Sequence, residues 1–227
     1  MNTYKMTARI VGVLFIIGTV AGLLSVVFTG PLYDPDYLIK VSANENQIII
    51  GDVLILIMGF ALAMVPVMLF PIFKKHNEAL ALGSVVFRGA LEAVTYIAMV
   101  IGHLLLVILS QEYVKAGAPD ASYFQTLGTL LLEAGVWLDH ILAIVFSLGA
   151  LMIYYLFYKS KLIPRWLSVW GLIGAMIYLA EPLLGMFGSI FEILYAPLAV
   201  QEMVFAVWLI VKGFNSSAIA PESAKQI

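Results

Sequence analysis

Nine ionisable residues stand inside long apolar stretches of this sequence, where charged side chains are rare. They are Asp52, Arg88, Glu92, His103, Glu133, Asp139, His140, Glu181 and Glu202. An unpaired charge at the centre of a bilayer costs at least about 2.5–3.5 kcal/mol on insertion scales. We therefore expect these groups to pair with one another or to line a wet cavity, and all of them except His103 form the candidate polar site.

Arg88 and Glu92 are four residues apart, so in a helix their side chains lie on one face and can form an ion pair. The pair has two interpretations. It can be a structural clamp that makes a buried charge tolerable, or it can belong to a functional site, because charges within a membrane are functional by default. The spacing alone does not decide between them.

A second polar group is centred on His140 and also contains Glu133, Asp139 and Glu202. Imidazole titrates near neutral pH and, like a carboxylate, binds divalent metal, so this group could be a proton relay or a cation site. Mutual hydrogen bonding is the alternative. A catalytic zinc site needs three protein ligands in close array, and no His-Glu-x-x-His spacing occurs, so we predict no metal. His103 is expected to be an ordinary packing or interfacial histidine.

A rise of about 1.5 Å per residue gives each group a depth, counted from the ends of the apolar stretches. By this count a midplane layer contains Arg88, Glu92, Asp139, His140 and Glu202. Nearer the outer face are Asp52, Glu133 and Glu181.

The composition explains why these depths refer to a bilayer. The chain has 227 residues, of which 63% are hydrophobic and 11% charged, and its mean hydropathy is +1.02. Water-soluble domains have about 45–50% apolar and about 25% charged residues. A net charge of −2 disfavours nucleic-acid binding, and the absence of cysteine excludes disulfides and thiolate metal sites. No phosphate-binding glycine loop or dinucleotide fingerprint occurs, so we expect no cofactor.

The apolar stretches predict an all-α, polytopic six-helix transmembrane bundle in a single domain, residues 1–214. The six spans cover about 8–29, 48–73, 81–110, 126–158, 167–186 and 190–211. The first is too long for a signal-peptide core and is expected to stay uncleaved. Polar loops are expected at 30–46 and 111–125, Pro66 and Pro71 should kink or end the second span, and 215–227 should be a disordered cytoplasmic tail.

Lysine and arginine fall mainly on one side of these spans. That side carries Lys5, Arg9, Lys74, Lys75, Lys159, Lys161, Arg165, Lys212 and Lys225. The other side carries only Lys40 and Lys115. The bias predicts that both termini are cytoplasmic, which requires an even number of spans. The cell inner membrane is the expected location.

Four segments carry a family resemblance: Ala8–Phe15, Phe87–Ala93, Leu162–Trp166 with Gly171–Gly174, and Glu202–Gly213. With them the chain resembles a bacterial integral-membrane family known as domain of unknown function 4386, over about Ala8 to Phe214. The resemblance implies a short six-helix membrane protein. It implies no activity, but it suggests that Arg88, Glu92 and Glu202 are family features.

Three functions follow as hypotheses. A small ion- or proton-coupled transporter would use the midplane charges to bind a small polar or cationic ligand. A membrane scaffold or accessory protein would use them only to specify helix packing. An intramembrane hydrolase or lipid-processing enzyme would use His140 and its carboxylates for acid–base chemistry, but enzyme function is the least favoured. The expected partners are the lipid bilayer and, for a transporter, a small polar or cationic ligand, and the sequence leaves the oligomeric state open.

Overall fold

The computed structural model describes residues 3–117, 121–189 and 191–219, and in these ranges the chain is helical with no strand. Six helical segments are long and apolar enough to cross a membrane. They are Thr3–Tyr33, Glu45–Phe73, Glu78–Ala116, Ser122–Ser160, Arg165–Gly185 and Glu192–Val211. The all-α architecture with six candidate spans is therefore confirmed.

The spans are built from named helices and short irregular turns. The long helices are α1 (Thr3–Thr29), α3 (Glu45–Phe73), α5 (Glu92–Ala116), α6 (Ala121–Ser160), α7 (Arg165–Gly185) and α8 (Ala196–Val211). The third span begins with α4 (Glu78–Ser84) and a π-helical segment, η2 (Val85–Leu91), before α5. The short elements are η1 (Gly30–Tyr33), α2 (Tyr37–Ala43), η4 (Glu192–Tyr195) and α9 (Ser216–Ile219).

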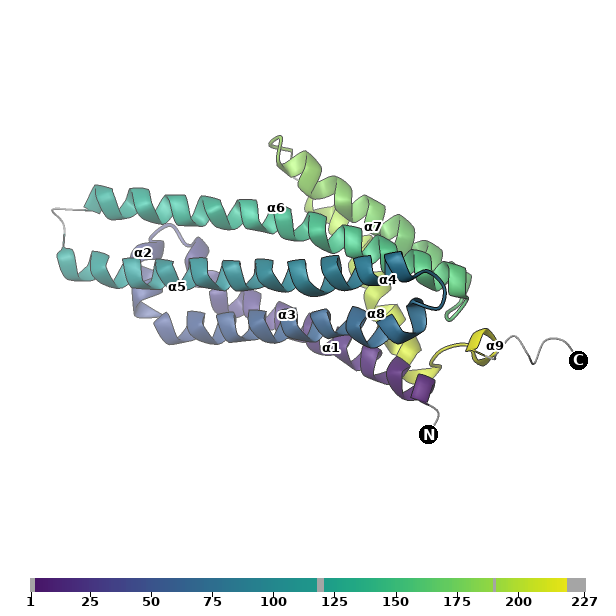
Figure 1. Cartoon of the computed structure of the whole chain (residues 1–227). Helices are drawn as coiled ribbons and strands as arrows, with labels where there is room; N and C mark the ends of the chain where they lie inside the picture. The colour runs from purple at the N-terminus through teal and green to yellow at the C-terminus, as the bar shows by residue number, and fades with distance from the viewer. Residues whose placement is uncertain (1–2, 118–120, 190, 220–227) are drawn as a thin grey trace, which may run out of the picture.

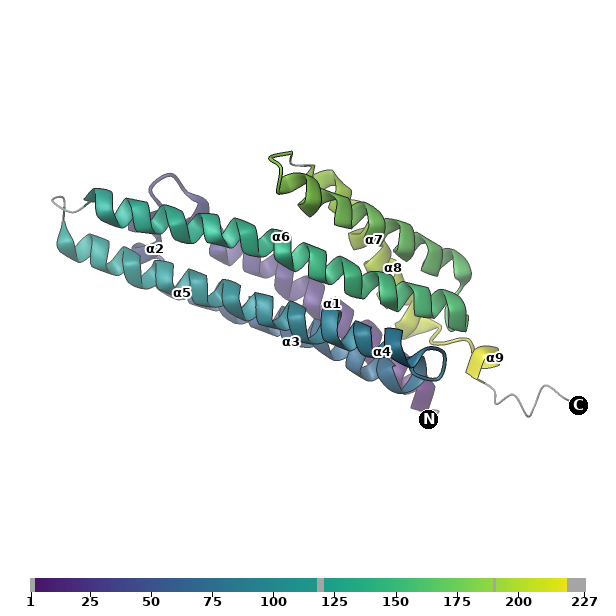
Figure 2. The same cartoon turned by 45° about the horizontal axis from the view of Figure 1, so that its top comes forward.

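The six spans pack as a closed ring. Each span contacts the next in the order α1, α3, α5 with α4 and η2, α6, α7 and α8, and α8 returns to α1. Figure 1 and Figure 2 show the helices side by side along one long axis, with α7 inclined away from α6. A ring of this kind gives every span an inward face, so polar groups on different helices can meet inside it.

The two ends of the bundle differ. The N-terminus and the end of α8 lie at one end, which we call the terminus end, and the α5–α6 hairpin projects furthest at the other, the hairpin end (Figure 1). α6 has 40 residues and is about 60 Å long, whereas α7 has 21 and is about 32 Å long. The hairpin therefore extends well beyond α7 and α8 (Figure 2).

Two expected loops are largely helical, so these two predictions were wrong. In the first, α2 forms because Leu38 and Val41, three residues apart, bury against Leu106 of α5. In the second, α5 continues to Ala116 and α6 begins at Ala121. This longer hairpin is supported by an edge-to-face contact between the rings of Tyr113 and Phe124, at 5.9 Å.

Two further expectations concern the prolines of the second span and the C-terminal tail. α3 continues through Pro66 and ends at Phe73, two residues after Pro71. Of the predicted disordered tail, residues 220–227 lie outside the described residues. The described part includes α9, and the backbone N–H of Asn215 donates to the carbonyl of Leu162 at 2.8 Å.

The core is aromatic and lies toward the terminus end. The Phe205 ring of α8 lies 5.5 Å from that of Phe15 in α1 and 5.1 Å from that of Phe157 in α6. Apolar side chains also cover the outside of the ring, as at Leu23 and Val26, both 69% exposed. An apolar exterior around an apolar core is typical of a bundle whose outer surface contacts lipid.

Candidate functional site

Arg88 lies at the inner face of the ring on a π-helical segment. The third span departs from α-helical geometry only over η2, Val85–Leu91, and Arg88 is at its centre. Single π turns within α-helices occur frequently at functional sites. The Arg88 side chain is 1% exposed, so the segment holds a full positive charge inside the bundle.

Close helix contact fixes this segment. A Cβ atom added to Gly149 of α6 would lie 2.7 Å from the backbone nitrogen of Arg88, a distance at which real Cβ atoms are not found. Only glycine therefore permits α6 to approach η2 this closely. Gly89, on the other side of η2, faces the Ala63 carbonyl and Pro66 of α3. The Arg88 backbone is thus held between α3 and α6.

Two carboxylates meet the Arg88 guanidinium, and we call the three residues the Arg88 triad. Nη1 donates to Oε1 and Oε2 of Glu92 at 2.7 and 2.8 Å, and Nη2 donates to Oε1 of Glu202 at 3.3 Å. The predicted pairing of Arg88 with Glu92 is confirmed. The structure also brings Glu202 of α8 to the same guanidinium, as the common depth of these groups suggested.

Aromatic rings enclose the triad. The guanidinium carbon lies 4.0 Å from the Phe146 ring centroid and 6.0 Å from that of Phe15. A cation over a ring face gains about 0.5–2 kcal/mol, most when water is excluded. Next to Glu202, the buried Gln201 side chain donates from Nε2 to the Leu167 carbonyl at 3.1 Å and ties α8 to α7.

The triad has an excess of negative charge when both carboxyls are ionised. One guanidinium balances one carboxylate, and the second leaves a net charge of −1 in a water-poor interior. Glu92 makes two short bonds and its side chain is 2% exposed, whereas Glu202 makes one longer bond and is 13% exposed. Because an unbalanced buried charge is costly, a proton or a bound cation at Glu202 is the simplest way to neutralise the site.

A second cluster, which we call the outer cluster, lies toward the hairpin end. It is formed by Asp52 of α3 and His103 of α5, and Asp139 of α6, whose side chain is exposed, lies near them. His103 Nδ1 and Asp52 Oδ1 are 2.7 Å apart, and Asp139 interacts electrostatically with both His103 and His140. Asp52 is 2% exposed, and its enclosed Oδ2 has no hydrogen-bond partner among the described residues.

The outer cluster corrects two sequence-based interpretations. His103 is hydrogen-bonded to Asp52 and is not an ordinary packing histidine. The expected single layer is two layers, because Asp139 precedes Gly149, which packs on Arg88, by ten residues, or about 15 Å of helix. The depth count failed because it started from the beginning of the apolar stretch, whereas α6 projects beyond α7 and α8 at the hairpin end (Figure 2).

Glu181 lies between the two groups with two tyrosines. The Tyr195 hydroxyl donates to Glu181 Oε2, and the Tyr195 and Tyr178 ring centroids are 4.2 Å apart. Tyr178 interacts electrostatically with both Glu181 and Glu202, and Tyr195 interacts with Asp139. Titratable side chains therefore continue from the Arg88 triad toward the outer cluster.

The expected His140 group does not assemble as one site. The Glu133 side chain is exposed on α6, and Glu202 pairs with Arg88. The His140 ring lies 6.0 Å from that of Trp137 and packs against Gly185. Among the described residues, no set of three or more histidine and acidic side chains is placed to hold a metal ion.

The sequence matches a known protein family over most of its length. The sequence profile of the family described as "Domain of unknown function (DUF4386)" matches residues 10–213. The chain belongs to the DUF4386 family. All eight candidate site residues lie within the DUF4386 match, and the description of the family names no activity. No curated protein and no solved structure matches the chain significantly, so the function of this DUF4386 protein has to be inferred from its geometry.

Proposed function

We propose that the protein is a proton-coupled carrier of a small polar or cationic solute in the bacterial inner membrane. The observation that carries the proposal is the unequal pairing of two carboxyls with one buried guanidinium. In this mechanism Glu92 stays paired with Arg88, while Glu202 alternates between a protonated state and an ionised, cation-bound state. Glu202 meets Arg88 on a π-helical segment of the third span, and π turns occur frequently at functional sites.

A route for the proton toward the hairpin end is part of the proposal. In this route, Tyr178, Tyr195 and Glu181 lead from Glu202 toward Asp139, which lies near the hydrogen-bonded His103 and Asp52. Histidine and carboxylate chains are the usual proton relays of membrane pumps and transporters. Asp52 Oδ2, which has no hydrogen-bond partner in the described part of the chain, is the acceptor that we assign to the outer end of the route.

We also propose that the terminus end is cytoplasmic. Eight described lysines and arginines belong to this end, from Lys5 in α1 to Lys212 after α8. At the hairpin end, Lys40 pairs with Asp34 at 3.0 Å and Lys115 with Glu112 at 2.7 Å. An excess of lysine and arginine on one side is the pattern of a cytoplasmic face.

The transport test uses proteoliposomes that contain a pH-sensitive dye. Each preparation receives an acid pulse outside, with a mixture of amino acids and small amines, and the rate of internal acidification is measured. We expect faster acidification with the wild-type protein than in empty liposomes. In Glu202→Gln, this rate above that of empty liposomes should fall at least tenfold. Glu192→Gln is the matched control, because Glu192 is exposed near the start of the same span.

Two results would count against the carrier. If liposomes with the wild-type protein acidify no faster than empty liposomes, the protein does not couple transport to protons. A Glu202→Gln rate equal to that of Glu192→Gln would remove Glu202 from the mechanism.

A scaffold is the second candidate, because Arg88 is fully enclosed by its carboxylates and rings and could serve packing alone. For a scaffold, neutralising Glu202 should change the thermal unfolding midpoint and leave proton flux untouched. For a carrier, flux should fall even when the midpoint is preserved.

A further inference from the structure

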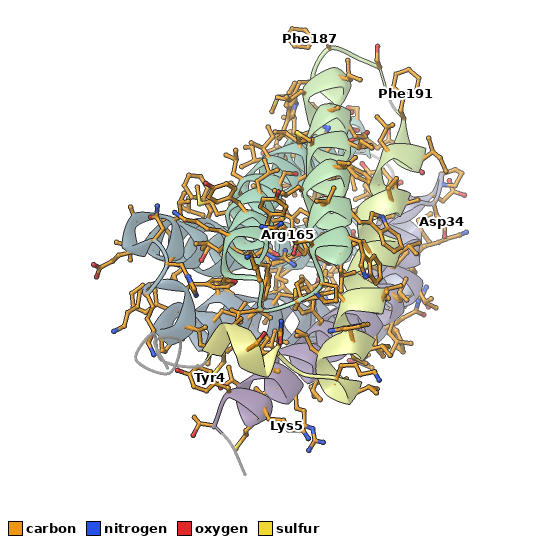
Figure 3. All side chains as sticks on the ribbon, turned by 90° about the vertical axis from the view of Figure 1, so that its right-hand side faces the viewer. Tyr4, Lys5, Asp34, Arg165, Phe187 and Phe191 are labelled. Atoms are coloured by element: carbon orange, nitrogen blue, oxygen red, sulfur yellow. The ribbon has the colours of Figure 1, made fainter. Side chains whose placement is uncertain are left out.

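A cavity of about 630 Å³ opens at the terminus end of the bundle. Its walls come from the turn between α6 and α7 and from the end of α8, and three of its lining residues are the cations Lys161, Arg165 and Lys212. Figure 3 views the molecule from this end and shows Arg165 at the α6–α7 turn. Neither the Arg88 triad nor the outer cluster contributes to this cavity.

The three cations have no acidic partner in the described part of the chain. None of the ion pairs found there includes Lys161, Arg165 or Lys212. The guanidinium of Arg165 lies over the ring of Tyr158, 5.2 Å from its centroid. In this position its N–H donors can hydrogen-bond to a ligand in the cavity. A concave site with three unpaired cations is complementary to a phosphate anion.

The walls of the cavity are held in place by the backbone. Lys161 adopts a left-handed conformation with φ of 58°, which turns the chain sharply after α6. The Asn215 N–H donates to the Leu162 carbonyl at 2.8 Å, joining the segment after α8 to this turn. The cavity is thus preformed, and binding does not have to order it.

An apolar groove of about 460 Å³ continues from the cavity along the surface of α8. Its lining includes Val204, Val207 and Val211, and it shares Trp208 and Lys212 with the cavity. Trp is enriched where headgroups meet acyl chains. A cationic cavity that leads into an apolar groove matches a molecule with an anionic head and a hydrocarbon tail.

We propose that the cavity and groove together bind one anionic phospholipid. The phosphate lies among Lys161, Arg165 and Lys212, and one acyl chain follows α8 past Trp208. Because α8 also carries Glu202, the lipid contacts the span whose carboxyl pairs with Arg88. The proposal does not depend on transport, and it applies equally to a scaffold.

Native mass spectrometry of the detergent-released full chain tests the site. Phosphatidylglycerol and phosphatidylcholine with identical acyl chains are titrated separately, and the dissociation constant of the first bound lipid is measured. We expect at least tenfold tighter binding of phosphatidylglycerol to the wild type. The variant Lys161→Gln/Arg165→Gln/Lys212→Gln should lose at least tenfold in that affinity.

The matched control is Arg9→Gln/Lys74→Gln/Lys159→Gln, which removes one arginine and two lysines from the same end but outside the cavity. It should keep the wild-type affinity within about twofold. Val207→Trp fills the groove without changing charge and should weaken phosphatidylglycerol binding by at least fivefold. Val207→Trp also tests the lipid site if the triple variant does not fold.

Three outcomes overturn the lipid site. They are equal binding of the two lipids, an equal loss in the control variant, and binding of glycerol phosphate as tightly as of phosphatidylglycerol. The last would assign the cavity to a soluble anion. All three can occur with normal proton flux, so they are distinguishable from failure of the carrier proposal.

Discussion

Among single residues, Arg88 is the one on which the polar interior depends. Breaking a buried ion pair by removing one partner costs about 3–5 kcal/mol, because the remaining charge is left unpaired. Arg88→Gln should therefore lower the thermal unfolding midpoint strongly. Arg88→Gln combined with Glu92→Gln should recover part of the loss, since it removes the orphaned carboxylate. Additive losses in the double variant would contradict the pairing.

His76 offers a pH-dependent test outside the membrane spans. Partial burial, followed by the charges of Lys159 and Lys75, lowers the pKa of His76 below its usual range. The folded chain then binds fewer protons at His76 than the unfolded chain, so its contribution to stability falls as the pH drops below about 6.5. NMR titration of the imidazole should show the lowered pKa, and Lys159→Gln should raise it. An unchanged pKa in that variant would contradict the electrostatic contribution.

At the scale of elements, the approach of α6 to η2 is the contact that positions the triad. Gly149→Ala places a methyl group against the Arg88 backbone, and overpacking of this kind costs about 1–3 kcal/mol. Gly102→Ala in α5 is the control, because nothing lies within 4 Å of its Cβ position. Thermal unfolding should show a loss for the first variant and no loss for the second. Equal midpoints would mean that the contact is not tight.

The sequence predicts elements better than it predicts contacts between them. The i,i+4 spacing of Arg88 and Glu92 needs only one helix, so it could be identified from the sequence. The pairing of Asp52 with His103 depends on how α3 and α5 dock. A usable signal existed, because these residues lie at similar distances before and after the turn at 74–77 and should have similar depths in an antiparallel hairpin.

For other features of the structure, the sequence contains no comparable signal. The π turn at η2 coincides with the packing of Arg88 between α3 and α6, which the sequence of one helix does not reveal. The projection of α6 at the hairpin end shifted the predicted depth of Asp139. The cavity at the α6–α7 turn joins residues about fifty positions apart, so spacing within one helix could not reveal it.

For the whole molecule, orientation is the first prediction. The chain has no cysteine, so a single introduced thiol can be labelled without background. In intact cells, a membrane-impermeant thiol reagent that reaches the periplasm should label Lys115→Cys and spare Lys74→Cys, whereas permeabilised cells should show both. Labelling of Lys74→Cys alone in intact cells would reverse the proposed orientation.

The central claim is that Glu202 of the Arg88 triad takes up and releases a proton within the bundle. Infrared difference spectroscopy of the reconstituted protein measures this directly, through the C=O stretching band of a protonated carboxylic acid as the pH is lowered. We predict that one component of this band, from a buried acid, grows on acidification in the wild type and in Glu192→Gln and is missing in Glu202→Gln, where the total band is therefore smaller. A band of the same size in Glu202→Gln would contradict the claim.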